Sequence, residues 1–358
     1  MGRLCPDLVA VEPFQVLSPD GTLQPGEEPT LSPDEVVTAL RLMLLSRRFD
    51  ERATAMNRQG RFGGFAPASG QEGCLVGSAL ALDPGRDWMV PQYRELPALV
   101  HHGYPLERLA AFSLGKADAA RVPDGVRMLP LQFSLAAQLP HAVGVAWGLS
   151  LLGQPGVVLA YCGEGATSEG DFHEACNLAG VLRAPVVFLV QDNGWAISTP
   201  RSRQSAAPNL AARALGYGFE GVVVDGNDLL AVYAVTCDAV RTARSGAGPT
   251  LIEAQTFRLA DHNMTDDPRR YRRREDVDAA RLRDPITRVQ RYLRSLGSWT
   301  EEDERAMADS VTGDVERALE AAFALPAQRP SDLFEHVRAA VPSGPLRHRG
   351  EIVGDGAV

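Results

Sequence analysis

The sequence predicts an α/β fold, a doubly wound parallel sheet with an extended arm before it and helices after it. Short apolar runs alternate with helical patterns between residues 156 and 255. These runs are apolar on both faces, which is typical of strands in a parallel sheet covered by helices on both sides. Beyond about residue 275 the chain becomes charged and helical, which indicates a C-terminal layer of helices.

Three regions follow from this pattern. Residues 1–31 are rich in Pro and Gly and show no period, so we expect an extended N-terminal arm. Residues 32–274 would form the α/β domain, and residues 275–358 a C-terminal helical layer and tail.

The first helix has a clear start signal. Ser32 can cap it, Pro33 suits the first helical position, and Glu35 completes a capping box. Apolar periodicity predicts the remaining elements. Helices are expected over 70–82, 139–153, 168–182, 208–215 and 227–245, and strands over 156–161, 185–190, 221–224 and 249–255.

Composition excludes several classes of protein. The formal net charge of −9 argues against a nucleic-acid surface, which needs a basic face. No apolar run approaches the roughly 20 residues that cross a bilayer, and the N-terminus does not resemble a signal peptide. Cysteines are scattered and odd in number (Cys5, Cys74, Cys162, Cys176 and Cys237), and form no CxxC. We therefore expect reduced thiols in a cytoplasmic protein that binds neither membrane nor nucleic acid.

An acid stands between two glycines at the end of the strand expected over 156–161, in Gly163-Glu164-Gly165. Glycines at such a turn usually admit a phosphate, which Glu164 would repel. The GxGxxG fingerprint of NAD-binding proteins does not fit the spacing to Gly170. A shared Mg²⁺ would remove the repulsion, because a carboxylate and a diphosphate can both bind it. The sequence therefore predicts a Mg²⁺–diphosphate site and makes an NAD-binding protein a weak alternative.

A second metal ligand is expected at the end of the next strand. Asn193 follows the strand over 185–190, in QDNGW, and its amide oxygen suits Mg²⁺. The nearby carbonyl of Trp195 is a candidate third ligand. Ligands of open parallel sheets bind at the carboxyl ends of strands, where both segments lie.

The pattern Gly-acid-Gly followed at this distance by Asn resembles the thiamine diphosphate motif. More specifically, GEGATSEGDFHEACNLAG with APVVFLVQDNGWAISTP resembles the alpha subunit of the E1 component of 2-oxoacid dehydrogenases, and the match runs from about residue 33 to about 325. Glu at position 164 and the segment GYGFEGVVVDGNDLLAVY are similar to the branched-chain members. The resemblance implies the thiamine diphosphate-binding fold.

The resemblance also implies the site. Mg²⁺ would be held by Glu164, Asn193 and the Trp195 carbonyl, and His262 would contact the diphosphate and serve in acyl transfer. Arg94 would neutralise the diphosphate through its planar guanidinium. The implied cofactor-binding residues are Gln92, Tyr93, Arg94, Leu135, Gly163, Glu164, Gly165, Ala166, Asn193, Trp195, Ile197 and His262. The implied partners are an E1 beta subunit in an α₂β₂ heterotetramer, the lipoyl domain of E2 and a 2-oxoacid substrate.

Several positions depart from the family pattern. Segment 115–134 is shorter and poorly matched, and Gln132 and Ala137 stand where a potassium site is expected. Gln191 replaces an arginine that helps the branched-chain enzymes to bind diphosphate. Asn263 and Arg273 replace serines that are phosphorylated in the family, so we expect no control by a kinase there.

We therefore expect an E1 alpha subunit that acts with a beta subunit in oxidative decarboxylation of a branched-chain 2-oxoacid. Pyruvate or acetoin is the alternative substrate. A subunit that has lost catalysis and acts by binding partners is a further alternative, because of the short 115–134 segment and Gln191.

Overall fold

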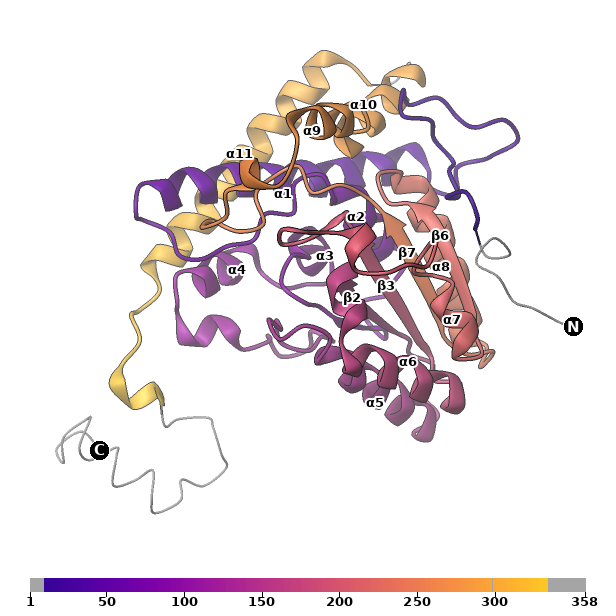
Figure 1. Cartoon of the computed structure of the whole chain (residues 1–358). Helices are drawn as coiled ribbons and strands as arrows, with labels where there is room; N and C mark the ends of the chain where they lie inside the picture. Colours follow the sequence, from indigo (N-terminus) through magenta and orange to yellow (C-terminus); the bar gives the residue numbers. More distant parts are fainter. Residues whose placement is uncertain (1–9, 298, 334–358) are drawn as a thin grey trace, which may run out of the picture.

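A five-stranded parallel sheet forms the centre of the molecule (Figure 1). The computed structural model describes residues 10–297 and 299–333. Cys5, the start of the expected arm and the expected tail after residue 333 lie outside these residues. The sheet order is β1-β2-β3-β7-β6. Its strands are β1 (Trp88–Val90), β2 (Val158–Gly163), β3 (Val186–Asp192), β6 (Glu220–Asp225) and β7 (Thr250–Gln255).

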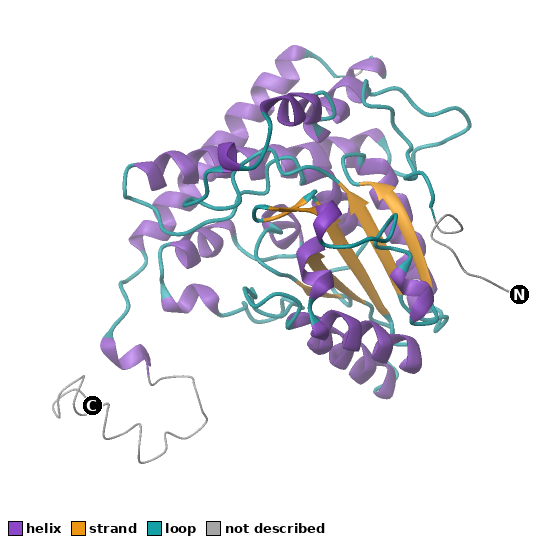
Figure 2. Ribbon diagram, viewed as in Figure 1, coloured by secondary structure: helices purple, strands orange, loops and turns teal. Residues whose placement is uncertain are grey.

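Helices cover both faces of this sheet (Figure 2). Along β3, Val187 and Leu189 join the core beneath α1, α2 and α8, whereas Val186, Phe188 and Val190 join the core beneath α5 and α6. The helices are α1 (Pro33–Arg58), α2 (Glu72–Leu80), α3 (Leu96–His101), α4 (Leu106–Ser113), α5 (Gln138–Leu151), α6 (Gly170–Leu182), α7 (Arg213–Gly216), α8 (Leu229–Arg244), α9 (Arg274–Arg281), α10 (Pro285–Ser295) and α11 (Glu301–Ala324). Within the described ranges, no helix is both long and apolar enough to cross a membrane.

The start of α1 is the one that the sequence predicts. The Ser32 side chain accepts from the Glu35 N–H, and the Glu35 carboxylate accepts from the Ser32 N–H at 2.8 Å. The arm before it is tied to the sheet. Phe14 pairs in parallel with Val224 of β6, and the N–H groups of the buried residues Val16 and Leu17 both donate to the Asp228 carboxylate.

Three strands end at the same level. Gly163 of β2 pairs with Gln191 of β3, and Asp192 pairs with Gln255 of β7. The loops that follow these strands therefore begin side by side. After β2 comes a 3₁₀ turn (Glu164–Ser168), and after β3 a two-stranded hairpin, β4 (Trp195–Ala196) and β5 (Thr199–Pro200).

Some elements differ from the sequence prediction. The helix expected over 208–215 is only the short α7, because the Glu253 carboxylate takes the N–H groups of Leu210 and Ala211 and holds the chain in turns before it. The helix expected from residue 168 begins at Gly170, after the 3₁₀ turn. The sequence did not predict β1, α3 and α4. A three-residue strand such as β1 is too short to show a period.

Candidate active site

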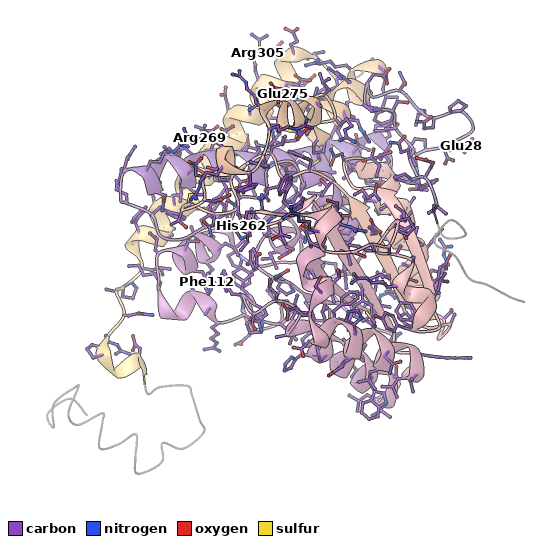
Figure 3. The ribbon with its side chains drawn as sticks, in the orientation of Figure 1. Glu28, Phe112, His262, Arg269, Glu275 and Arg305 are labelled. Atoms are coloured by element: carbon purple, nitrogen blue, oxygen red, sulfur yellow. The ribbon has the colours of Figure 1, made fainter. Side chains whose placement is uncertain are left out.

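A pocket of about 650 Å³ lies where the loops after β2, β3 and β7 meet the segments before α2 and α3. His262 is half-buried and lies near the centre of the view in Figure 3, whereas the side chain of Arg269, from the same loop, is 88% exposed. Every cofactor-binding residue implied by the sequence lines this pocket. They are Gln92, Tyr93, Arg94, Leu135, Gly163, Glu164, Gly165, Ala166, Asn193, Trp195, Ile197 and His262.

Glu164 is a buried carboxylate at one end of the pocket. Glu164 is the first residue of the 3₁₀ turn after β2, and it is 1% exposed. Oε2 accepts from the Asn193 N–H at 3.4 Å, while Oε1 has no hydrogen-bond partner among the described residues. Burial, followed by the charge of Asp192, raises the pKa of Glu164 to about 7. A cation at Oε1 would relieve both effects.

The two glycines beside Glu164 have different tasks. A Cβ on Gly165 would lie 2.7 Å from the Cβ of Ala196, so the hairpin β4–β5 can pack here only against a glycine. Gly163 meets nothing within 4 Å at that position, and its N–H donates to Gln92 Oε1 at 3.2 Å. Gly165 thus brings the loops after β2 and β3 together beside Glu164, and Gly163 joins the end of β2 to Gln92.

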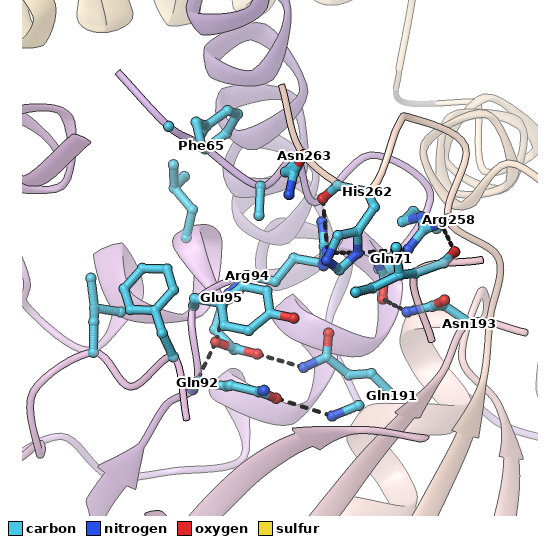
Figure 4. A pocket seen from close by; sticks show the side chains of 18 of the residues that line it. Phe65, Gln71, Gln92, Arg94, Glu95, Gln191, Asn193, Arg258, His262 and Asn263 are labelled. Atoms are coloured by element: carbon cyan, nitrogen blue, oxygen red, sulfur yellow. Dashed lines mark hydrogen bonds between the residues drawn. The ribbon is translucent and has the colours of Figure 1, made fainter. Parts of the chain in front are cut away.

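Asn193 faces the same end of the pocket. Its Nδ2 donates to Gln71 Oε1 at 3.4 Å (Figure 4). Its Oδ1 accepts from the Trp195 N–H at 3.3 Å. Among the described residues there is no cluster of three or more His, Cys, Asp and Glu side chains that could hold a metal. The oxygens available at this end of the pocket are the Glu164 carboxylate, the Asn193 amide oxygen and backbone carbonyls. Such a set fits Mg²⁺ if phosphate oxygens of a ligand and water complete its coordination.

Arg94 and Arg258 form a cationic wall. Both are buried, and neither forms a salt bridge within the part of the chain that the structure describes. Arg258 donates to the carbonyls of Trp195, at 3.5 Å, and Ile197, at 3.0 Å. Burial, followed by the charge of Arg94, lowers the pKa of Arg258 to about 10, so it stays charged at neutral pH. Two buried cations that have no acid partner in the described ranges fit a ligand that carries at least two negative charges.

His262 lies against both arginines. Its Nδ1 is 3.3 Å from Arg94 Nη2 and 2.9 Å from Arg258 Nη1. A guanidinium can only donate, so Nδ1 accepts and the neutral ring carries its proton on Nε2. Burial, followed by the charges of Arg94 and Arg258, lowers the pKa of His262 to about 4. At neutral pH the residue is therefore a neutral donor through Nε2.

Glu95 fixes the Gln-Tyr-Arg segment. Its Oε2 accepts from the N–H groups of Gln92, at 3.0 Å, and Arg94, at 2.9 Å. Its Oε1 accepts from Gln191 Nε2 at 2.6 Å, and burial raises its pKa. Gln191, noted above only as the loss of an arginine, therefore ties the segment to the end of β3.

The other wall of the pocket is apolar. The Phe133 ring stacks on Tyr93, with ring centres 5.4 Å apart, and on Phe112, with ring centres 5.9 Å apart. Phe65 packs edge-on against Phe49 at 5.4 Å. Leucines complete this wall, and they are Leu96, Leu99, Leu109, Leu131 and Leu135. The pocket can therefore hold a charged group at one end and an apolar group at the other.

Comparison with known proteins identifies the family. Residues 40–331 match the dehydrogenase E1 component. Pyruvate dehydrogenase E1 component subunit alpha of Bacillus subtilis (strain 168) is 39% identical over 331 residues, covering 92% of this chain and 89% of that one. The protein of the same name from Bacillus cereus is 40% identical over 333 residues, covering 92% and 90%. The chain belongs to the dehydrogenase E1 component family.

This E1 alpha subunit of a 2-oxoacid dehydrogenase belongs to a family that depends on thiamine diphosphate. The family expected from the sequence is thus confirmed. A third relative, from Staphylococcus aureus (strain COL), is 38% identical over 326 residues, covering 90% and 88%, and is also named pyruvate dehydrogenase E1 component subunit alpha. These relatives do not support the branched-chain type and favour the alternative, pyruvate.

Sequence reasoning missed several pocket residues of this E1 alpha subunit. Arg258 lies four positions before His262, and the available signal was a cation three residues after the strand expected over 249–255. Gln71 stands one residue before α2 and Glu95 one residue before α3, positions that suggest only helix starts. Their roles become visible only in the structure, where Gln71 bonds to Asn193 and Glu95 bonds to Gln191.

Proposed function

We propose that this chain is the alpha subunit of a pyruvate dehydrogenase E1 component and binds Mg²⁺ and the diphosphate of thiamine diphosphate. One observation carries the proposal: Oε1 of buried Glu164 has no hydrogen-bond partner among the described residues, and Glu164 lines the same pocket as two arginines that form no salt bridge with those residues. The three relatives described above, each named pyruvate dehydrogenase E1 component subunit alpha, support pyruvate as the substrate. As expected of the family, the chain would act in an α₂β₂ heterotetramer with an E1 beta subunit and pass the acyl group to the lipoyl domain of E2, in the cytoplasm.

Each residue has a stated task in this proposal. Glu164, Asn193 and the Trp195 carbonyl would hold Mg²⁺, and Arg94 and Arg258 would neutralise the diphosphate. Thiamine diphosphate, when bound, supplies the carbanion and electron sink for loss of CO₂ from a 2-oxoacid.

His262 would donate from Nε2 to an oxygen in the pocket, and it is the candidate for acyl transfer to the lipoyl group. Its Nδ1 is engaged by both guanidinium groups, so the donor orientation is set before a ligand arrives. The apolar wall around Phe133 and Phe112 would exclude water from the reacting end.

Calorimetric titration of thiamine diphosphate into the complex with the beta subunit, with and without Mg²⁺, tests the metal site. We expect Glu164→Gln to weaken Mg²⁺-dependent binding at least tenfold, since a charged oxygen ligand is lost. The exposed Glu169, at the start of α6, gives the matched control Glu169→Gln, which should bind like the wild type. Equal binding by the two variants would remove Glu164 from the metal site.

The branched-chain 2-oxoacid expected from Glu164 and its flanks remains the competing substrate. Rates of CO₂ release from pyruvate and from 3-methyl-2-oxobutanoate, measured on the same complex, separate the two. We expect pyruvate to be faster. A faster rate with 3-methyl-2-oxobutanoate would restore the branched-chain assignment, and cofactor binding without turnover of either acid would favour the subunit that has lost catalysis.

A further inference from the structure

Gln71 joins three parts of the pocket. It immediately precedes α2, its side chain is fully buried, and it lines the pocket. Its Oε1 accepts from Asn193 Nδ2 at 3.4 Å, across 122 positions of sequence. Its Nε2 has no partner among the described residues. A buried amide with one unpaired group costs about 1–3 kcal/mol, so packing alone gives no reason to place it here.

The backbone of Gln71 is held from two sides. On one side, the Asp50 carboxylate accepts from the N–H and the hydroxyl of Ser69, at 2.8 and 2.7 Å. On the other, the Thr256 hydroxyl donates to the Gly70 carbonyl at 2.9 Å. Gly70 has φ +94°, and a Cβ on it would lie 2.2 Å from the Phe257 carbonyl oxygen. Only glycine permits this contact, so residues 69–71 are clamped between α1 and the exit of β7.

The two neighbours of Asn193 specify one orientation of its carboxamide. Gln71 Oε1 requires a donor, which is Nδ2, and the Trp195 N–H requires an acceptor, which is Oδ1. A flipped carboxamide would place Nδ2 against the Trp195 N–H and lose that hydrogen bond. Oδ1, the atom that suits a metal, is thereby kept on the side of Trp195.

We propose that Gln71 is a positioning residue that holds the Asn193 carboxamide with Oδ1 available to the metal. The inference rests on the proposed function, because it assumes Mg²⁺ at Glu164 and Asn193. Gln71 does not touch the metal. It acts through the acceptor that it offers to Asn193 Nδ2.

Two variants separate this role from simple packing. Gln71→Met keeps the length of the side chain but removes the acceptor, whereas Gln71→Glu keeps an acceptor for Nδ2. The readouts are the Mg²⁺ concentration that half-saturates thiamine diphosphate binding to the complex with the beta subunit, by calorimetry, and the Tm of the same complex without ligand. The exposed Gln59 gives the matched control Gln59→Met.

We expect Gln71→Met to raise the half-saturating Mg²⁺ concentration about tenfold or more, the usual effect of removing a group that orients a metal ligand. Gln71→Glu should remain within about threefold of the wild type, since the orienting bond is kept. Binding by Gln71→Met equal to that of the wild type would overturn the inference. So would Gln71→Glu as weak as Gln71→Met. A wild-type complex that binds no cofactor would instead refute the proposed function, so the two failures are distinguishable.

Discussion

Two fully buried arginines, Arg288 and Arg258, stand in opposite electrostatic surroundings. Arg288 lies 2.9 Å from an Asp225 oxygen and 3.9 Å from an Asp228 oxygen. Arg258 forms no salt bridge with any described residue and lies beside Arg94 and His262. Leaving a buried charge without a counter-charge costs several kcal/mol. The fold supplies the counter-charge to Arg288 itself, whereas in the proposed function a bound ligand would supply it to Arg258.

The largest effect on stability is expected at Arg288, where the fold supplies both the cation and its carboxylate partners. Arg288→Met should lower the free energy of unfolding by about 3–5 kcal/mol, because two buried carboxylates lose their cation. Urea denaturation measures this change. Arg291→Met, at an exposed position on the same helix, is the control and should change it by less than about 0.5 kcal/mol. Similar losses in both variants would mean that the buried pair is not the source of stability.

Arg258→Met should affect binding more than folding. We expect thiamine diphosphate to bind the complex with the beta subunit about 10–100-fold more weakly, since a hydrogen bond to a charged group contributes roughly 1.5–3 kcal/mol. The free energy of unfolding without ligand should fall by less than half of the decrease expected for Arg288→Met. Calorimetry and urea denaturation provide the two numbers. A strong loss of stability with unchanged binding would reverse the comparison between the two arginines.

The pH dependence of stability gives a further test of the environment of Arg258, because His262 lies in the same environment. Burial and the two arginines lower its pKa from 6.5 to about 4. Between these values the unfolded chain binds more protons, so the contribution of this group to stability is complete above pH 6.5 and is lost as the pH falls toward 4. Urea midpoints at pH 7.5 and 5.0 should therefore differ more in the wild type than in His262→Gln. Identical differences would show that the arginines do not act on this ring.

The smallest effect is expected at an exposed pair. Arg121 and Asp124 are 69% and 92% exposed along their side chains. Water screens such a pair, so Arg121→Ala should change the free energy of unfolding by less than about 0.5 kcal/mol. The same urea measurement applies. A larger loss in the free energy of unfolding would show that exposed ion pairs contribute to the stability of this chain.

The sequence predicted the parts of the site that carry a local signal. Glu164 between glycines and Asn193 after an apolar strand are visible because strand ends share an edge of the sheet. Gln71 and Arg258 could not be assigned in this way. The bond from Gln71 to Asn193 spans 122 positions, and Arg258 reaches the carbonyl of Trp195 across 63. Such contacts depend on tertiary packing, which a single sequence does not display.

The preference for a branched-chain substrate shows a second limit. It rested on Glu164, which lines the pocket, and on the segment GYGFEGVVVDGNDLLAVY, which lies outside the pocket lining. Pyruvate and 3-methyl-2-oxobutanoate have apolar side chains, and the proposed function would place them against the wall around Phe133 and Phe112, which gave no recognisable motif. The short α7 has a similar cause, because Glu253 acts on Leu210 and Ala211 from more than 40 positions away.

The arm before α1 also has a consequence for solubility. β6 is the last strand of the sheet, and an unpaired outer strand is a template for association with other chains. Phe14 occupies part of that template through hydrogen bonds of 3.0 Å to the Val223 carbonyl and from the Asp225 N–H. A chain shortened to begin at residue 18 would expose this strand and take two N–H donors from Asp228. We expect this shortened form to aggregate more readily than the full chain.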